Sequence, residues 1–194
     1  MTVLLALDIA THCGFARGSI AGHRATTPIE AASGVRAAQP EGGTRAFRGP
    51  LGEAMARFAD WLWRTTEGVD LLAYECPILP RTTTIDTIRR LDGLAGIAAM
   101  VAHKRGLPEP LTPQPAEIKR HWAGSGRAEK TDMVKACRDR GWTCVDDNHA
   151  DALALWDFTV AQIAAGLWRP KSIFRPATVG AKIDAPRVRR KGAA

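Results

Sequence analysis

The chain has 194 residues, enough for one domain with a sizeable core, and its 45% hydrophobic and 24% charged residues are typical of a globular protein. No apolar run approaches the roughly 20 residues of a membrane span. The apolar start contains Asp8 and has no basic leader, so we expect a first strand rather than a signal peptide, and a cytoplasmic protein without a membrane partner. The four cysteines form no CxxC pair and no zinc spacing, which predicts reduced thiols.

The net charge of +7 belongs to the C-terminal end of the chain. After Trp168 the sequence has eight basic residues and one acidic residue, so residues 1–168 sum to zero. We expect one domain over residues 1–168, followed by a basic, loosely ordered arm over residues 169–194. The composition of the arm favours a polyanion as partner, nucleic acid first, and a solubility tail is the alternative.

The first fifty residues predict a strand meander. Residues 2–8 and 15–20 have the composition of strands, and a turn at residues 12–14 joins them, so we expect a hairpin. A third strand is expected within residues 21–50, where the periodicity is weak.

Helices dominate the rest of the chain around one further buried strand. Apolar residues recur at helical spacing over residues 51–66, and residues 69–74 form a nearly continuous apolar run, as in a strand covered on both faces. A long helix with small residues is expected over residues 85–104. Beyond it the sequence predicts a short strand at 111–113, helices at 115–122, 130–140 and 149–165, and a short extended piece at 142–145.

This order of elements predicts an α/β fold. A strand meander, a helix, a strand and then mostly helices fit a mixed sheet flanked by helices. No GxGxxG follows the first strand, which excludes a dinucleotide-binding fold.

Carboxylates close both of the apolar strands. Asp8 ends the first and Glu75 ends the second, where a buried charge costs free energy unless a cation pairs with it. Mg²⁺ prefers such oxygen ligands. The alternatives are a capping or ion-paired role for Asp8, and an ion pair of Glu75 with Arg81, Arg89 or Arg90.

A third acidic group stands before the last apolar helix. Asp147 and Asp151 are four residues apart and therefore share one helical face, toward which Asn148 also points. The alternative is that these acids interact with the helix dipole. The dipole explains Asp146 or Asp147 well, but it explains Asp151, at the head of the apolar stretch, less well.

Two lysines flank a glycine-rich turn. Lys119 precedes the turn at residues 123–126, and Lys130 heads the helix after it, an arrangement that can meet a phosphate. The segment is not a P-loop, because GxxxxGK[ST] is absent. A plain solvated loop is the alternative.

Four segments together resemble the RuvC-type Holliday junction resolvases of the ribonuclease H-like superfamily, especially the phage and prophage branch. They are LALDIATHCGFA, LLAYECP, KRHWAGSGRAEK and DDNHADALAL, and the resemblance runs from about Val3 to about Ala165. It implies an α/β fold with a mixed five-stranded sheet flanked by helices. Sugar-kinase-like ATPases also begin with a strand, an Asp and a turn, but they need further phosphate loops that this chain lacks.

The resemblance assigns catalytic and metal-binding roles to carboxylates. Asp8 and Glu75 match the first two catalytic carboxylates of the family, and Asp151 matches the last. The family often places its remaining acid, or a His, three residues before the last Asp, where this chain has an asparagine. We favour Asp147 as the fourth ligand because of its helical spacing, and His149 is the alternative.

The implied reaction is metal-dependent hydrolysis of a DNA phosphodiester with two Mg²⁺ ions, for which Mn²⁺ can substitute. Lys119 and Lys130 match basic residues that face the DNA backbone, and Arg127 lies in the same segment. Because a four-way junction has pseudo-twofold symmetry, we expect a homodimer, with the helix over residues 85–104 as candidate interface. The expected function is a Holliday junction resolvase acting in recombination or phage DNA processing. Two alternatives stay open: another ribonuclease H-like nuclease acting on RNA or flapped DNA, and a nucleic-acid-binding module with a dead site.

Overall fold

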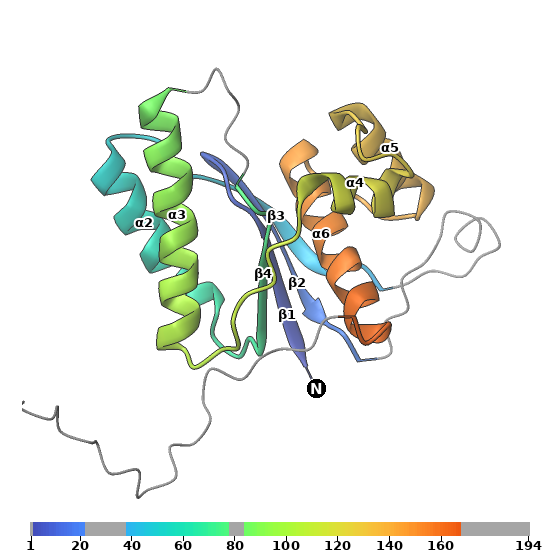
Figure 1. Cartoon of the computed structure of the whole chain (residues 1–194), viewed down its shortest axis with the longest axis horizontal. Coiled ribbons are helices and arrows are strands. Elements are labelled where there is room, and N and C mark those ends of the chain that lie inside the picture. The colour runs from blue at the N-terminus through green and yellow to red at the C-terminus, as the bar shows by residue number, and fades with distance from the viewer. Residues whose placement is uncertain (1, 22–37, 78–83, 168–194) are drawn as a thin grey trace, which may run out of the picture.

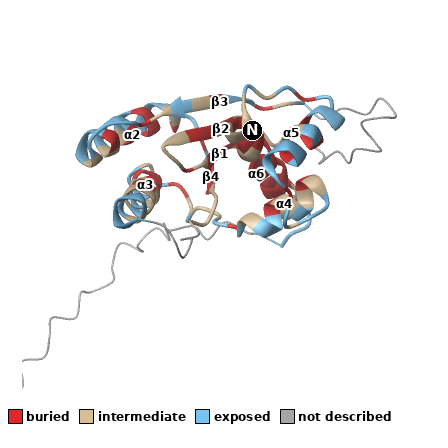
Figure 2. Cartoon of the chain, turned by 90° about the horizontal axis from the view of Figure 1, so that it is seen from above, coloured by how far each residue is buried: buried red, intermediate tan, exposed pale blue. Residues whose placement is uncertain are grey.

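The structure, a computed structural model that describes residues 2–21, 38–77 and 84–167, has a mixed sheet between two layers of helices (Figures 1 and 2). The strands are β1 (Val3–Asp8), β2 (His12–Ser19), β3 (Glu41–Ala46) and β4 (Leu71–Tyr74). The helices are α2 (Leu51–Thr65), α3 (Ile85–Lys104), α4 (Pro115–Ala123), α5 (Lys130–Asp139) and α6 (Asp147–Ala164). Within the described ranges, no helix combines the length and apolarity needed to cross a membrane.

The strand order of the sheet is β3-β2-β1-β4. β1 and β2 form the predicted hairpin, in which Asp8 lies opposite Gly14, and β3 extends the sheet antiparallel to β2. β4 lies parallel to β1, with Leu7 opposite Tyr74. Because β1 and β4 are parallel neighbours, their carboxyl ends lie side by side at the same end of the sheet.

The described part of the chain has a sheet of four strands, so the expectation of five was wrong. The segment predicted as a short strand at 111–113 occupies the place beside β4, but it pairs only locally. Leu111 forms one parallel bridge with Ala73 and shares backbone hydrogen bonds with Leu72 and Tyr74. Four prolines between residues 108 and 115 have no N–H to donate, which explains why the pairing does not extend into a strand.

Two other segments differ from the sequence prediction by more than two residues. β2 begins at His12, because the connection after β1 is shorter than the expected turn. Residues 142–145 form no strand. Trp142 is buried there with its ring between those of Trp122 and Trp156, so side-chain packing rather than strand pairing holds this piece in place.

Alternation along β1 divides the core into two halves, one on each face of the sheet. Leu5 and Leu7 pack with residues of α2 and α3, whereas Leu4 and Ala6 pack with residues of α4, α5 and α6. Figure 2 shows these two helical layers on opposite sides of the sheet. Asp8 continues the alternation of Leu4 and Ala6, so its side chain belongs to the face that α6 covers.

The small residues of α3 have two different surroundings. Gly93 faces α2, where an added Cβ would lie 1.8 Å from Met55 Cε, so this glycine allows the two helices to pack closely. Gly96 faces open space, and Ile85 and Met100 of the same helix are 58% and 44% exposed. Part of α3 therefore presents an apolar outer surface.

Two further expectations concern the thiols and the arm. All four cysteines are free in the structure, as predicted. The basic arm expected over residues 169–194 lies outside the described residues, as does Arg81.

Candidate active site

Asp8 and Glu75 stand at the carboxyl ends of neighbouring strands. Asp8 is the last residue of β1, and Glu75 directly follows β4. The Glu75 backbone N–H donates to the Leu7 carbonyl at 3.3 Å, which joins the two strand ends. Arg90, one of the arginines considered as a partner of Glu75, instead donates to two backbone carbonyls before α2. Glu75 forms no ion pair with any residue that the structure describes.

The first turn of α6 packs directly on β2. An added Cβ at Gly14 would lie 1.9 Å from the Asn148 carbonyl oxygen, so only glycine permits this contact. Asp146 caps the helix by accepting from the His149 N–H at 2.8 Å, and it also accepts from Thr44 Oγ1 of β3 at 2.5 Å. Because Gly14 lies opposite Asp8, these contacts place the start of α6 beside the end of β1.

Burial and mutual repulsion raise the pKa of three carboxyl groups. Burial raises the pKa of Asp8 well above its ordinary value, and the charges of Glu75 and Asp151 add to the effect. Burial, with repulsion from Asp151, raises the pKa of Glu75 to about 7. Burial raises the pKa of Asp151 to about 6, although Lys119 and Lys130 oppose this shift. These mutual effects mean that the three groups lie close enough together to interact.

Asp147 is the outer member of the acidic group and is paired with a lysine. Its carboxylate accepts a hydrogen bond from Lys130 Nζ, and this bond is the main reason that the pKa of Asp147 is lowered and that of Lys130 is raised. The negative charge of Asp147 also raises the pKa of Asp8 and of Asp151. Asp147 thus belongs to the same electrostatic cluster.

The His149 ring lies against β3. Its Nδ1 accepts a hydrogen bond from the Val145 N–H at 3.2 Å. An added Cβ at Gly42 of β3 would lie 2.7 Å from His149 Nε2, which is buried and has no hydrogen-bond partner among the described residues. β3 is at the opposite edge of the sheet from β4, which leads into Glu75. This orientation supports Asp147 over His149 as the fourth ligand.

The predicted basic residues gather on the α4–α5 side of the acids. Lys119, Arg127 and Lys130 line an open groove of about 490 Å³. Lys119 acts on the pKa values of both Glu75 and Asp151, so the groove adjoins the acidic cluster. A negatively charged strand in this groove would be held by cations next to the carboxylates.

The four carboxylates match Mg²⁺ in their chemistry. Their donors are all oxygens, and three of them bear charges that burial and repulsion oppose and that a cation would stabilise. In the ranges described, no three His, Cys, Asp or Glu side chains gather closely enough to hold a metal ion. Instead, the Asp147 carboxylate forms an ion pair with Lys130. The donor set thus fits the ion, and coordination would require these side chains to converge further.

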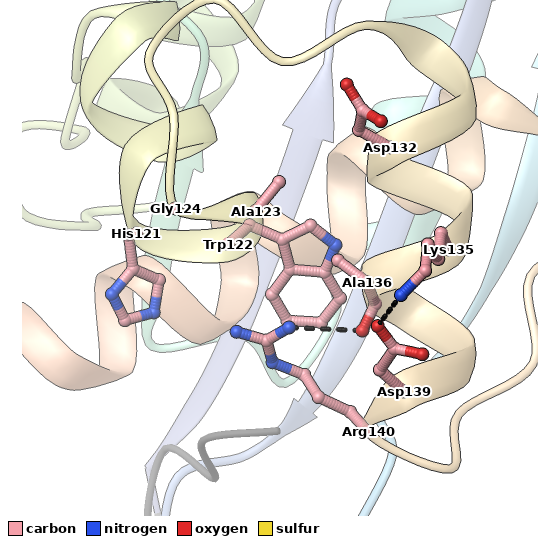
Figure 3. Close-up of a pocket in the computed structure, with 9 residues that line it drawn as sticks. All are labelled: His121, Trp122, Ala123, Gly124, Asp132, Lys135, Ala136, Asp139 and Arg140. Atoms are coloured by element: carbon pink, nitrogen blue, oxygen red, sulfur yellow. Dashed lines mark hydrogen bonds and ion pairs between the residues drawn. The ribbon is translucent and has the colours of Figure 1, made fainter. Parts of the chain in front are cut away.

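A separate hollow of about 350 Å³ lies between α4 and α5 (Figure 3). Trp122, Arg140, and the ion pair between Lys135 and Asp139 at 2.6 Å line it. None of the four carboxylates borders this hollow. It is therefore distinct from the acidic cluster.

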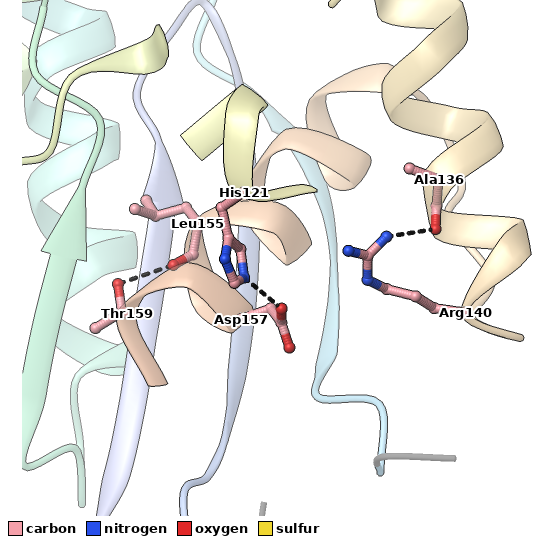
Figure 4. Close-up of polar contacts among 6 residues, drawn as sticks. All are labelled: His121, Ala136, Arg140, Leu155, Asp157 and Thr159. Carbon is pink, nitrogen blue, oxygen red and sulfur yellow. Dashed lines mark hydrogen bonds and ion pairs between the residues drawn. The ribbon is translucent and has the colours of Figure 1, made fainter. Parts of the chain in front are cut away.

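The sequence did not reveal a buried polar network beside this hollow (Figure 4). Asp157 is only 1% exposed, and its Oδ2 lies 2.8 Å from His121 Nε2. Arg140, 3% exposed, lies over the Trp122 ring at 3.9 Å and donates to the Ala136 carbonyl. An aspartate inside an apolar helical run was the available signal. The network ties α4 to α6, and thereby fixes the helix that carries Lys119.

The fold is that of the RuvC resolvases. The structure of Thermus thermophilus RuvC superposes with a TM-score of 0.66 at 19% identity, over 88% of this chain and 100% of the other. Thermus thermophilus RuvC in complex with a Holliday junction substrate gives 0.65 at 15% identity, over 88% and 100%. The yeast mitochondrial Holliday junction resolvase Ydc2 gives 0.57 at 15% identity, over 84% and 80%.

Comparison with known sequences does not assign the chain to a family. No protein family model and no curated protein matches the chain. At 15–19% identity, the structural neighbours establish the fold alone. The ribonuclease H-like α/β fold implied by the four sequence segments is confirmed, with four strands rather than five.

Proposed function

We propose that this protein is a Mg²⁺-dependent endonuclease that cuts four-way DNA junctions as a homodimer. The observation that carries the proposal is the interacting set of partly buried carboxylates at the ends of β1 and β4 and the start of α6. The RuvC fold supports it, as does the neighbour that was solved with a Holliday junction substrate.

Asp8, Glu75, Asp147 and Asp151 are the proposed ligands of two Mg²⁺ ions. The bound ions would supply activation of a water molecule and stabilisation of the leaving oxygen. Asp8, which interacts with the other three carboxylates, would be one of the residues that hold the metal. Glu75 and Asp151 flank it, and Asp147 completes the set after releasing Lys130.

Lys119, Arg127 and Lys130 are the proposed contacts to the DNA backbone. They adjoin the carboxylates from α4, α5 and the loop between these helices. Such contacts position a strand without reading its bases. Lys130 is paired with Asp147 in this structure, so it would contact a phosphate only after leaving that carboxylate.

A homodimer suits the twofold symmetry of a four-way junction, because each subunit then faces one of two opposed strands. α3 is the proposed interface. Its outer face is open at Gly96, and Ile85 and Met100 are exposed there.

The decisive experiment compares substrates. Purified full-length protein is incubated with synthetic four-way junctions, flaps, duplexes and RNA–DNA hybrids in Mg²⁺, in Mn²⁺ and in chelator, and cut sites are mapped. Two symmetric nicks in the junction, only with metal, are expected. Preferred cutting of flaps or hybrids would favour the other ribonuclease H-like activity, and tight junction binding without any cleavage would favour a dead binding module.

A further inference from the structure

Arg48, in the connection between β3 and α2, is held against His12 at the start of β2. Its Nε and Nη2 lie 3.1 and 2.7 Å from His12 Nε2. An arginine has only donors, so Nε2 is the acceptor, and the proton of the neutral ring is on Nδ1. His12 Nε2 therefore anchors the guanidinium, and Arg48 presents only N–H donors to a ligand.

The backbone on both sides of Arg48 is fixed. The Phe47 N–H donates to the Thr11 carbonyl at 2.7 Å, and the Phe47 side chain is buried. Arg90 of α3 donates to the carbonyls of Phe47 at 3.1 Å and of Gly49 at 2.8 Å. The connection thus holds Arg48 in place before any ligand arrives, which reduces the entropy lost on binding.

The charge of Arg48 is available for a new partner. Its side chain is exposed, and none of the described carboxylates pairs with it. Arg48 contacts His12 through one edge of the guanidinium, and its remaining N–H groups have no acceptor among the residues that the structure describes. Exposed donors of this kind, without an acceptor, suit a phosphate oxygen.

Arg48 and His12 lie at the same end of the strands as the acidic cluster. His12 is two residues from Gly14, which lies opposite Asp8 and touches the first turn of α6. Residues two apart in a strand share a face, so His12 is on the α6 face, as Asp8 is. The connection that carries Arg48 leads into α2, and α2 lies in the helical layer opposite α4–α6 (Figure 1).

We infer that Arg48, positioned by His12, binds a backbone phosphate of the DNA strand on the side of the acidic cluster opposite Lys119 and Lys130. This inference rests on the proposed function and extends it. A strand crossing the carboxylates would be held by α4 and α5 on one side and by the β3–α2 connection on the other. Contacts on both sides of the cut phosphate fix the strand better than contacts on one side, because they limit its rotation.

The test measures binding of the full chain to a synthetic four-way junction in the cleavage-inactive Glu75→Gln background. Arg48→Ala should lower affinity about threefold to tenfold and reduce the salt slope by about 0.9, the value for one lost phosphate contact. Arg48→Lys keeps the charge but not the planar geometry of the guanidinium. Its affinity for the junction should therefore lie between those of the parent protein and Arg48→Ala. The matched control is Arg64→Ala, which removes one exposed charge from the far end of α2 and should change neither quantity.

A phosphate scan identifies the contact. Methylphosphonate linkages, which are neutral, replace one phosphate at a time near the mapped cut. One linkage should weaken binding when Arg48 is present but have no further effect in the Arg48→Ala variant. His12→Ala should cost less affinity than Arg48→Ala, and the double variant should resemble Arg48→Ala, because His12 acts only through the arginine.

Two negative results have different meanings. If wild type cuts junctions but Arg48→Ala behaves like Arg64→Ala and no linkage distinguishes the variants, the inference about Arg48 is wrong. If wild type neither binds nor cuts junctions, the proposed function itself is wrong. Melting temperatures of all variants, which should match wild type within about 2 °C, separate both results from misfolding.

Discussion

Three carboxyl groups at the candidate site, those of Asp8, Glu75 and Asp151, are unfavourable to ionise in the folded protein without a bound cation. Asp8 is the clearest case, since burial and two neighbouring acids raise its pKa. Ionisation of Asp8 therefore lowers the stability of the folded state. Such a cost at the end of a core strand is expected of a functional site rather than of a structural one.

Removing one proposed ligand should nearly abolish cleavage. Asp8→Asn, Glu75→Gln and Asp151→Asn should each lower the cleavage rate by more than about a hundredfold, because even indirect supports of metal sites cost about that much. Junction binding should persist or become tighter, since repulsion against phosphate is reduced. Asp60→Asn, on the exposed face of α2, is the control and should leave the rate unchanged. A wild-type rate in any of the three variants would remove that residue from the site.

The fourth ligand can be identified by comparing Asp147→Asn with His149→Ala. We expect a large loss of cleavage for Asp147→Asn, because this carboxylate belongs to the acidic cluster. His149→Ala should mainly lower stability, because the ring is buried and accepts from the Val145 N–H. Metal titration followed by cleavage rate measures the first effect, and thermal melting measures the second. The reverse pattern would transfer the role to His149.

Stability of the metal-free protein should depend on pH through the same groups. The pKa of Glu75 rises from 4.5 to about 7 on folding, and that of Asp151 from 3.8 to about 6. The folded state therefore holds more protons in this window, so these groups stabilise it at low pH, and this stabilisation is lost as pH rises through about 7. Because the raised pKa of Asp8 makes its ionisation unfavourable in the folded state, Asp8→Asn should melt above wild type at pH 8 in chelator, by roughly 2–4 °C per kcal/mol relieved.

The pH experiment has a direct control. The advantage of Asp8→Asn should shrink toward pH 4, where wild-type carboxyls are protonated, and saturating Mg²⁺ at pH 8 should raise the melting temperature of wild type more than that of the variant. Asp60→Asn should follow wild type at every pH. A variant less stable than wild type at pH 8 would contradict the raised pKa of Asp8.

At the scale of elements, the site depends on how closely α6 approaches the β1–β2 hairpin. α6 carries Asp147 and Asp151 at its start and is buried along most of its length. Its first turn touches β2 at Gly14, which is the direct pairing partner of Asp8 on the neighbouring strand. The same helix holds α4 through Asp157 and His121. α6 therefore sets the positions of Asp147 and Asp151 and helps to position α4, which carries Lys119.

Gly14→Ala should damage stability and activity together. The added Cβ would meet backbone atoms of Asn148, which cannot turn away, so we expect a loss of about 1–3 kcal/mol in the free energy of unfolding. Cleavage should fall further than stability explains, because α6 moves relative to β1. Gly52→Ala is the matched control: nothing lies within 4 Å of its added Cβ, and it should stabilise α2 by about 0.5–1 kcal/mol. Urea unfolding and cleavage assays measure both; an unaffected Gly14→Ala variant would contradict the packing.

At the scale of the whole molecule, the net charge is concentrated in the sequence after Trp168. The eight basic residues and one acid after Trp168 equal the net charge of the chain, and none of the proposed metal ligands lies among them. We propose that residues 1–168 are the nuclease domain and that residues 169–194 tether it to DNA. The tether would act through counterion release, which depends on charge rather than on shape.

Truncation after Trp168 tests this division. The shortened protein should keep metal-dependent cleavage, and its affinity for DNA should fall, more for duplex than for junctions, since the folded body supplies shape recognition. Electrophoretic binding assays at two salt concentrations measure the loss, which should be larger at low salt. A chain in which the arm's basic residues are replaced by Ser serves as a control for length. Unchanged duplex affinity at low salt would contradict the tether, and unfolding of the truncated chain would contradict the domain boundary.

Local sequence patterns were enough to predict several elements of the fold and most of the candidate carboxylates. Apolar spacing within a few residues predicts the helix over residues 85–104. It also predicts the hairpin whose first strand ends in Asp8. Asp8, Glu75 and Asp151 were candidates because a charge at the end of a buried element is costly wherever the element lies. Both signals are carried by neighbours in the sequence, so no tertiary contact is needed to read them.

Tertiary structure decided the rest, because pairing and burial depend on residues far apart in the chain. The glycine-rich segment of β3 has little strand propensity of its own and becomes a strand by pairing with β2. The fifth strand is reduced to a bridge beside β4 by prolines that cannot donate. His149 lies against Gly42, and Arg48 meets His12 across 36 positions. Such contacts form only when the sheet brings distant segments together, which no local periodicity encodes.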